Sequence, residues 1–183
     1  MPPSLLCVYH SRTSFTAHLA SHLLSGARAT AASLDSPLDV RLLPASSATA
    51  ADLLAADGYL FAAPENLGSL SGAFLEFLHE AYYPCFDARE GEERSLLLGR
   101  PYAGAIGGGS DGTSAARQLE RICTGWRLRE VRKGGPLVVR NGLVQTKENI
   151  LMDKGGELVR VEDRERLEEL GGLVAATMLL GED

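Results

Sequence analysis

LLCVYHSRTSFT, residues 5–16, is an apolar run that gives way to a cluster of hydroxyl side chains. Its first five residues favour a β-strand. A helix is predicted directly after it, because Phe15, Leu19 and Leu23 recur at intervals of four and share one helical face. A buried strand that leads into a helix is typical of a βα unit, and repeated units of this kind form a parallel sheet covered by helices.

The same alternation continues along the chain. Further strands are predicted at 38–43, 59–63, 102–106 and 126–131, and further helices at 48–56, 74–82, 116–123 and 167–178. Pro84 and Gly125 are expected to end the two middle helices. Residues 87–94 are predicted to form a charge-dense surface loop, and residues 134–161 a hairpin or an exposed excursion. The fold class expected is α/β, in one domain that spans 1–183.

Composition excludes several classes of protein. The chain has 183 residues, 45% of them hydrophobic, which is enough for one α/β core but not for two. With 18 basic and 24 acidic residues the net charge is -6, and the sequence has no basic stripe of the kind that would indicate nucleic acid as a partner. No apolar run is long enough to cross a membrane, and the first residues do not resemble a signal peptide, so we expect a cytoplasmic protein without a membrane partner.

Cysteine usage gives no sign of a metal site or a disulfide framework. Cys7, Cys85 and Cys123 are odd in number and widely spaced, and no CxxC pair occurs. We expect reduced, buried thiols.

The first strand is followed by a segment suited to an anion. Four hydroxyl residues fall within 11–16, directly before a helix whose N-terminal N–H groups and dipole attract negative charge. One hydroxyl would be enough for an N-cap alone, so four of them favour phosphate binding. The segment is neither a Walker A loop nor a glycine-rich Rossmann turn.

Two further loops follow the third and fourth predicted strands. Residues 64–72, PENLGSLSG, combine a proline, a central glycine and Ser71 before a helix, which fits either a rigid ligand loop or an ordinary βα loop capped by Ser71. Residues 107–114, GGGSDGTS, leave room for a planar ring or another backbone, and taken alone would be a flexible loop with a helix cap. Because ligands of open parallel sheets bind at the carboxyl ends of the strands, all three loops are expected to form one site.

Together the three loops resemble those of flavodoxin-like proteins, and in particular the NAD(P)H-dependent FMN reductases. Residues 11–16 are similar to the phosphate pattern S/T-x-T-G-x-T, with Ser14 where glycine is usual. Residues 63–72 resemble the reductase pattern T-P-E-Y-N-x-S-x-x-G, without the aromatic before the asparagine. The resemblance covers roughly 5–131 and the last helix.

The resemblance implies a five-stranded parallel sheet in the order 2-1-3-4-5, with FMN phosphate over the first loop and the isoalloxazine between the other two. The residues implied to hold FMN are Ser11, Arg12, Thr13, Ser14, Phe15, Thr16, Pro64, Glu65, Asn66, Leu67, Gly68, Ser69, Gly107, Gly108, Gly109, Asp111 and Gly112. The cofactor carries the redox chemistry, so no catalytic acid–base residue and no metal is assigned. His10 is interpreted as a hydrogen-bonding residue and Glu65 as a loop anchor. Trp126 and Tyr102 are expected to pack in the core.

Two functions follow from the resemblance. An NAD(P)H-dependent oxidoreductase would use NAD(P)H as co-substrate and pass hydride through FMN to a quinone, a free flavin, a metal ion or another small acceptor. A flavodoxin-type electron carrier would dock on redox proteins without NAD(P)H turnover. Carriers usually have a strongly acidic face, whereas Arg12, Glu65 and Asp111 give a mixed one, which favours the enzyme. A flavin-binding module without turnover is a third interpretation. A homodimer or homotetramer is expected, because a second subunit would complete the open flavin face.

Overall fold

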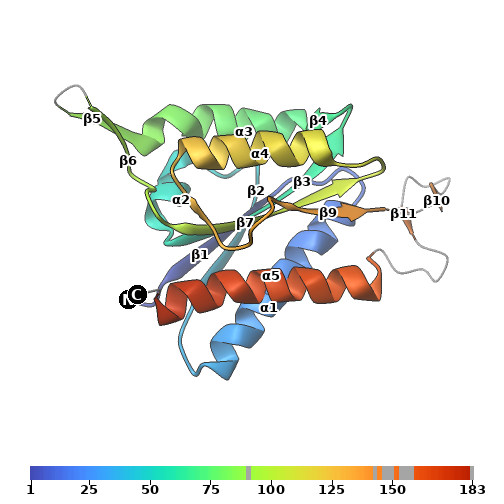
Figure 1. Cartoon of the computed structure of the whole chain (residues 1–183), viewed down its shortest axis with the longest axis horizontal. Helices are drawn as coiled ribbons and strands as arrows, with labels where there is room; N and C mark the ends of the chain where they lie inside the picture. Colours follow the sequence, from blue (N-terminus) through green and yellow to red (C-terminus); the bar gives the residue numbers. More distant parts are fainter. Residues whose placement is uncertain (90–91, 142–143, 146–150, 153–158, 182–183) are drawn as a thin grey trace.

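The computed structural model describes residues 1–89, 92–141, 144–145, 151–152 and 159–181. A parallel sheet lies at its centre (Figure 1). Its strands, in spatial order, are β2 (Asp39–Pro44), β1 (Ser4–Tyr9), β3 (Gly58–Asn66), β7 (Pro101–Gly108) and an edge position shared by β8 (Arg129–Glu130) and β9 (Leu137–Arg140). All of these neighbours pair in parallel. The predicted α/β class and the predicted order 2-1-3-4-5 are confirmed.

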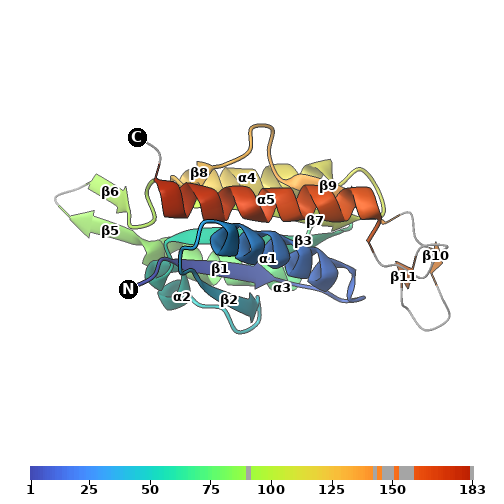
Figure 2. The same ribbon diagram turned by 90° about the horizontal axis from the view of Figure 1, so that it is seen from below.

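Helices cover both faces of the sheet, as the alternating pattern requires. The two on one face are α1 (Phe15–Ser33) and α5 (Val161–Leu180), which lie side by side (Figures 1 and 2). The other face carries α2 (Ala50–Ala55), α3 (Gly72–Tyr82) and α4 (Thr113–Gly125). None of the helices in the described part of the chain combines the length and apolarity that a membrane span needs.

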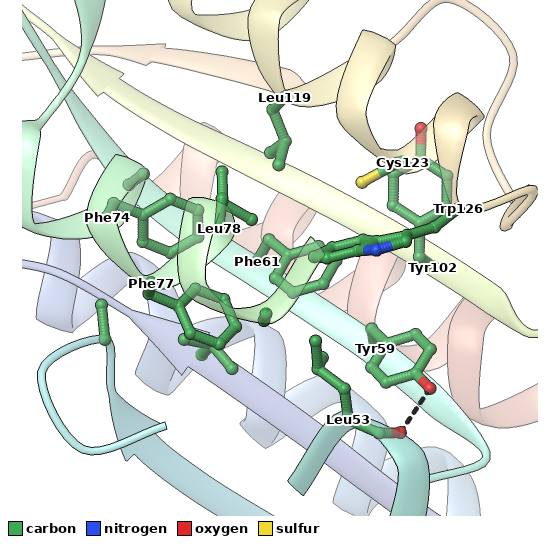
Figure 3. Packing of buried hydrophobic residues seen from close by; sticks show 14 of the residues in the cluster. Leu53, Tyr59, Phe61, Phe74, Phe77, Leu78, Tyr102, Leu119, Cys123 and Trp126 are labelled. Carbon is green, nitrogen blue, oxygen red and sulfur yellow. Dashed lines mark hydrogen bonds between the residues drawn. The ribbon is translucent and has the colours of Figure 1, made fainter. Parts of the chain in front are cut away.

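Each helical layer encloses its own hydrophobic cluster, because both faces of a parallel sheet must be buried. The cluster under α3 and α4 is aromatic: Phe61, Tyr102 and Trp126 are buried there (Figure 3), which confirms the core role predicted for the last two. The ring of Trp126 stacks on Tyr82 with centroids 5.8 Å apart. All three cysteines are buried and free, as expected.

The edge strand beside β7 differs from the prediction. Helix α4 ends at Gly125, as predicted, and Trp126 is its C-cap residue, so only Arg129 and Glu130 of the predicted strand 126–131 pair with β7. Most of the edge strand is β9, which lies in the stretch 134–161 predicted as a hairpin or an exposed excursion. The Val131 N–H still donates to Tyr102 O of β7, and residues 132–136 then leave the sheet, with positive φ at Gly134 and Gly135. These glycines and the following proline interrupt the apolar pattern of the strand, so the sequence did not indicate that the strand position continues in β9.

Two hairpins complete the described chain. Most of the stretch predicted as a loop at 87–94 forms strands instead: β5 (Phe86–Arg89) and β6 (Glu92–Ser95) pair antiparallel, with Asp87 opposite Arg94, and 90–91 lie outside the described residues. Opposite charges on facing positions stabilise such a pair. Within 134–161, β10 (Val144–Gln145) pairs antiparallel with β11 (Leu151–Met152), so the predicted hairpin is present in part, and 142–143, 146–150 and 153–158 lie outside the described residues.

Candidate functional site

The three loops singled out from the sequence lie side by side. Tyr9 at the end of β1 is in register with Ala62, and Pro64 in β3 is in register with Gly107 in β7. Because these strands are parallel, their carboxyl ends open on one edge of the sheet. The prediction that the loops converge is therefore confirmed by the topology.

The first loop ends at an uncapped helix terminus. Ser14, the N-cap residue of α1, has φ 67 and ψ -19, a left-handed conformation that glycine adopts most readily. Its side chain makes no capping bond, and the first turn of α1 contains no acidic residue. The N-terminal N–H groups and the helix dipole therefore remain available to an anion. Thr16, in the first turn of α1, is buried, whereas Arg12 of the loop is exposed.

The same loop contains a buried hydroxyl without a partner. Within the described residues, Ser11 Oγ is the only buried side-chain nitrogen or oxygen that makes no hydrogen bond. An unpaired hydroxyl of this kind costs about 1–3 kcal/mol, and native proteins retain few of them. A ligand oxygen would relieve that cost.

His10 joins the first loop to the second. Its Nδ1 lies 2.7 Å from Ser71 Oγ. Burial, and secondarily the positive charge of Arg12, lower the pKa of His10 from its usual 6.5. Ser71 is 1% exposed, so this pair links two loops rather than presenting a nucleophile. The hydrogen-bonding role expected of His10 agrees with this contact.

The second loop is a tight hairpin rather than a loop that leads directly into a helix. β3 continues to Asn66, turns through two residues, and pairs antiparallel with β4 (Ser69–Leu70). Leu67 (φ 54) and Gly68 (φ 74) both lie in the left-handed region, as a two-residue turn of this kind requires. The side chain of Leu67 is fully exposed at the tip. Ser71 is the N-cap residue of α3, as considered, but its hydroxyl makes no capping hydrogen bond and contacts His10 instead.

The glycines of the third loop are less open than predicted. Gly107 and Gly108 are buried residues of β7, and only Gly109 is exposed. A Cβ on Gly107 would lie 3.0 Å from Phe15 Cδ1 and from Thr16 Oγ1, so this glycine lets the start of α1 approach the sheet. A Cβ on Gly108 would lie 3.3 Å from a carboxylate oxygen of Glu65.

Polar contacts hold the second and third loops together. The Ser110 hydroxyl donates to the Glu65 carboxylate, in agreement with the anchoring role expected of Glu65. Asp111 Oδ1 accepts from the Thr113 N–H at 2.9 Å, and this bond is the main cause of the lowered pKa of Asp111. Gly112, with φ 66, precedes α4.

Asn141 lies at the carboxyl edge of the sheet, although the sequence did not indicate it as a site residue. The Asn141 N–H donates to Gly108 O at 3.0 Å, and its side-chain oxygen lies beside Gly109. Asn141 follows directly after β9, and because that strand was not predicted, its position at the end of a strand was not predicted either. The run LVVR at 137–140, rich in strand formers, was the signal that could have revealed it.

The edge as a whole is suited to a phosphorylated ligand. An uncapped helix terminus and an orphan hydroxyl lie next to a hairpin and a glycine-rich strand end. Among the described residues, no group of three or more histidine, cysteine or acidic side chains is placed to hold a metal ion.

Sequence comparisons identify no relative: no protein-family model matches the chain, and no curated protein matches it. Structural comparison does find similar folds. A flavodoxin from Streptococcus pneumoniae TIGR4 has 18% identity and a TM-score of 0.65, over 95% of this chain and 99% of that one. A WrbA-like flavodoxin from Agrobacterium tumefaciens has 19% identity and a TM-score of 0.62, over 96% and 97%.

The fold also occurs as part of a larger enzyme. The rubredoxin oxygen:oxidoreductase of Desulfovibrio gigas has 13% identity and a TM-score of 0.67, over 97% of this chain and 37% of that one. At these identities the likenesses show the fold, which is flavodoxin-like.

Proposed function

We propose that this chain, which has a flavodoxin-like fold, binds FMN non-covalently at the carboxyl edge of its sheet and acts as an NAD(P)H-dependent oxidoreductase. The observation that carries the proposal is the first loop, where the Ser11 hydroxyl is buried without a partner above an uncapped helix. A phosphate would satisfy this hydroxyl and the free N–H groups together.

The residues divide naturally between the two ends of FMN. Ser11, Thr13 and the first N–H groups of α1 would hold the phosphate, and Arg12 would add positive charge. The hairpin tip at Leu67–Gly68 and the exposed backbone at Gly109 would border the ring. When bound, FMN supplies the redox chemistry, while these residues bind, orient and shield it.

An open ring face supports the oxidoreductase over a carrier. The hairpin tip holds a leucine rather than a large aromatic side chain, which leaves room for a nicotinamide. The loops also carry mixed charge, with Arg12 in the first, Glu65 in the second and Asp111 in the third, and Arg140 of β9 helps to lower the pKa of Asp111. The carrier remains the second candidate, because several of the similar structures are flavodoxins.

Anaerobic mixing of the FMN-loaded protein with NADPH or NADH separates the two functions. We expect the visible flavin absorbance to bleach within seconds with at least one nucleotide. A matched sample reduced by dithionite shows the full amplitude. If dithionite bleaches the flavin and neither nucleotide does, the oxidoreductase proposal is wrong and the carrier is favoured.

A further inference from the structure

A groove runs beside the candidate flavin site, between the β3–β4 hairpin and helix α4. Gly68 and Ser69 of the hairpin form one side, and Ser114, Arg117, Arg121 and Ile122 of α4 form the other. Its volume of about 550 Å³ is that of a small-molecule site. Because Gly68 belongs to the hairpin tip, a ligand that reaches the ring site can extend into the groove.

The groove carries local positive charge in an acidic protein. Arg117 and Arg121 are four residues apart on α4 and therefore share one face of the helix. Both side chains are exposed, and neither forms a salt bridge within the part of the chain that the structure describes. No acidic residue lines the groove. The Asp111 carboxylate of the third loop is held mainly by Thr113, and the charges of Arg140 and Arg117 contribute less to the lowering of its pKa.

Gln118 adds a hydrogen-bond donor. Its Oε1 accepts from the Leu70 N–H and from the Ser69 hydroxyl, both at 3.0 Å. A backbone N–H only donates, so the oxygen must face the hairpin and the amide NH₂ is left for another partner. Ile122 gives the groove a partly buried apolar patch. Two guanidinium groups, an amide donor and an apolar patch together suit a phosphorylated nucleoside.

We infer that this groove holds the adenosine end of NADPH, with Arg117 and Arg121 contacting its 2′-phosphate. The inference rests on the proposed oxidoreductase function and deepens it, since it names NADPH rather than NADH as the reductant. Arginine binds phosphate through two parallel hydrogen bonds, and it is the residue that accommodates the 2′-phosphate in other dinucleotide sites. NADH carries a hydroxyl there and would leave both guanidinium groups without an anion.

The kinetic test uses the FMN-loaded protein in anaerobic stopped-flow experiments. The second-order rate constants for reduction by NADPH and by NADH are compared in the wild type, in Arg117→Gln/Arg121→Gln and in Arg28→Gln. Arg28 is an exposed residue of α1, on the opposite face of the sheet, and controls for a lost positive charge. We expect the double variant to lower the NADPH to NADH ratio at least about tenfold, as lost charged hydrogen bonds imply. An unchanged ratio would overturn the inference.

A binding test distinguishes failure of the inference from failure of the proposed function. Adenosine 2′,5′-bisphosphate and 5′-AMP are titrated calorimetrically into the FMN-loaded protein and into the double variant. Preferential binding of the bisphosphate that the variant loses supports the groove, even if neither dinucleotide reduces the flavin and the oxidoreductase function fails. Reduction by both dinucleotides at equal rates, without bisphosphate binding, overturns the groove and leaves the function standing.

Discussion

Ser14 and Leu67 have left-handed backbone conformations, which residues other than glycine, asparagine and aspartate rarely adopt. Each costs on the order of 1 kcal/mol, and both residues lie at the carboxyl edge of the sheet. Leu67 in addition exposes its whole side chain to solvent. Asp35 and Arg127 have positive φ as well, so it is the combination of positive φ with a fully exposed apolar side chain that makes Leu67 suited to border a ligand.

His10 provides a titration test of the first loop. We expect its NMR-detected pKa to lie below 6.5, because burial and Arg12 disfavour the imidazolium. Arg12→Gln should raise this pKa by removing a repulsive charge, while Arg28→Gln should leave it unchanged. FMN should also raise it, since a phosphate anion nearby favours the cation. A His10 pKa at or above 6.5 in the free wild type would contradict this description of the loop.

The pH dependence of stability follows from the same shift. Since the folded-state pKa of His10 is lowered, the unfolded chain takes up the proton at higher pH. The contribution of neutral His10 to stability is therefore complete above about pH 6.5 and declines as the pH falls through that value towards the folded pKa.

At the scale of elements, the hairpin turn can be tested by one substitution. Leu67→Asn should stabilise the protein by about 0.5–1 kcal/mol in urea unfolding, because Asn-Gly is the favoured sequence for a two-residue turn with both φ values positive. It should also weaken FMN binding if the leucine borders the ring. Leu96→Asn, at an exposed leucine without positive φ, should give no such stabilisation. Destabilisation by Leu67→Asn would refute the turn geometry.

The packing of α1 on α5 depends on glycines. A Cβ on Gly171 would lie 1.8 Å from Leu23 O, and one on Gly26 would lie 1.8 Å from Glu168 O. The two helices thus approach backbone to backbone. Gly171→Ala should destabilise the protein by roughly 2 kcal/mol or more, as overpacking does. Gly72→Ala is the control, because its Cβ would meet nothing within 4 Å. Equal urea midpoints for the two variants would contradict the close crossing.

The elements that the sequence revealed are those with a strong apolar pattern. Strands β1, β3 and β7 are almost continuously buried, so each was predicted from a run of apolar residues. Helices α3 and α4 were predicted because their apolar residues recur on one helical face. β9 has only four residues and follows a glycine–proline break, which concealed it. Pairing across a sheet, as in β5 and β6, depends on contacts that local pattern does not encode.

At the scale of the whole molecule, the site was predictable in place but not in detail. Parallel topology alone brings the three loops to one edge, so their convergence followed from the strand order. The contact of Gly107 with Phe15, the His10–Ser71 bond and the place of Asn141 required coordinates, because each joins residues distant in sequence. The cytoplasmic location and the oligomeric state stay predictions.

The arrangement of the molecule places its features at two ends. The candidate site lies at the carboxyl edge of the sheet, and the β5–β6 hairpin extends from the opposite end (Figures 1 and 2). The helical layers close the sheet from both sides. A ligand therefore reaches the loops from the edge, which is where parallel sheets of this class bind theirs.

Calorimetric titration of the flavin-free protein with FMN and with riboflavin tests the central claim most directly, because the two ligands differ only in the phosphate. We predict that FMN binds at least about tenfold more tightly than riboflavin, as charged hydrogen bonds from the first loop imply. Ser11→Ala should reduce this ratio without lowering the stability of the free protein, since it removes an unpaired buried hydroxyl. Equal affinities for FMN and riboflavin in the wild type would contradict the account.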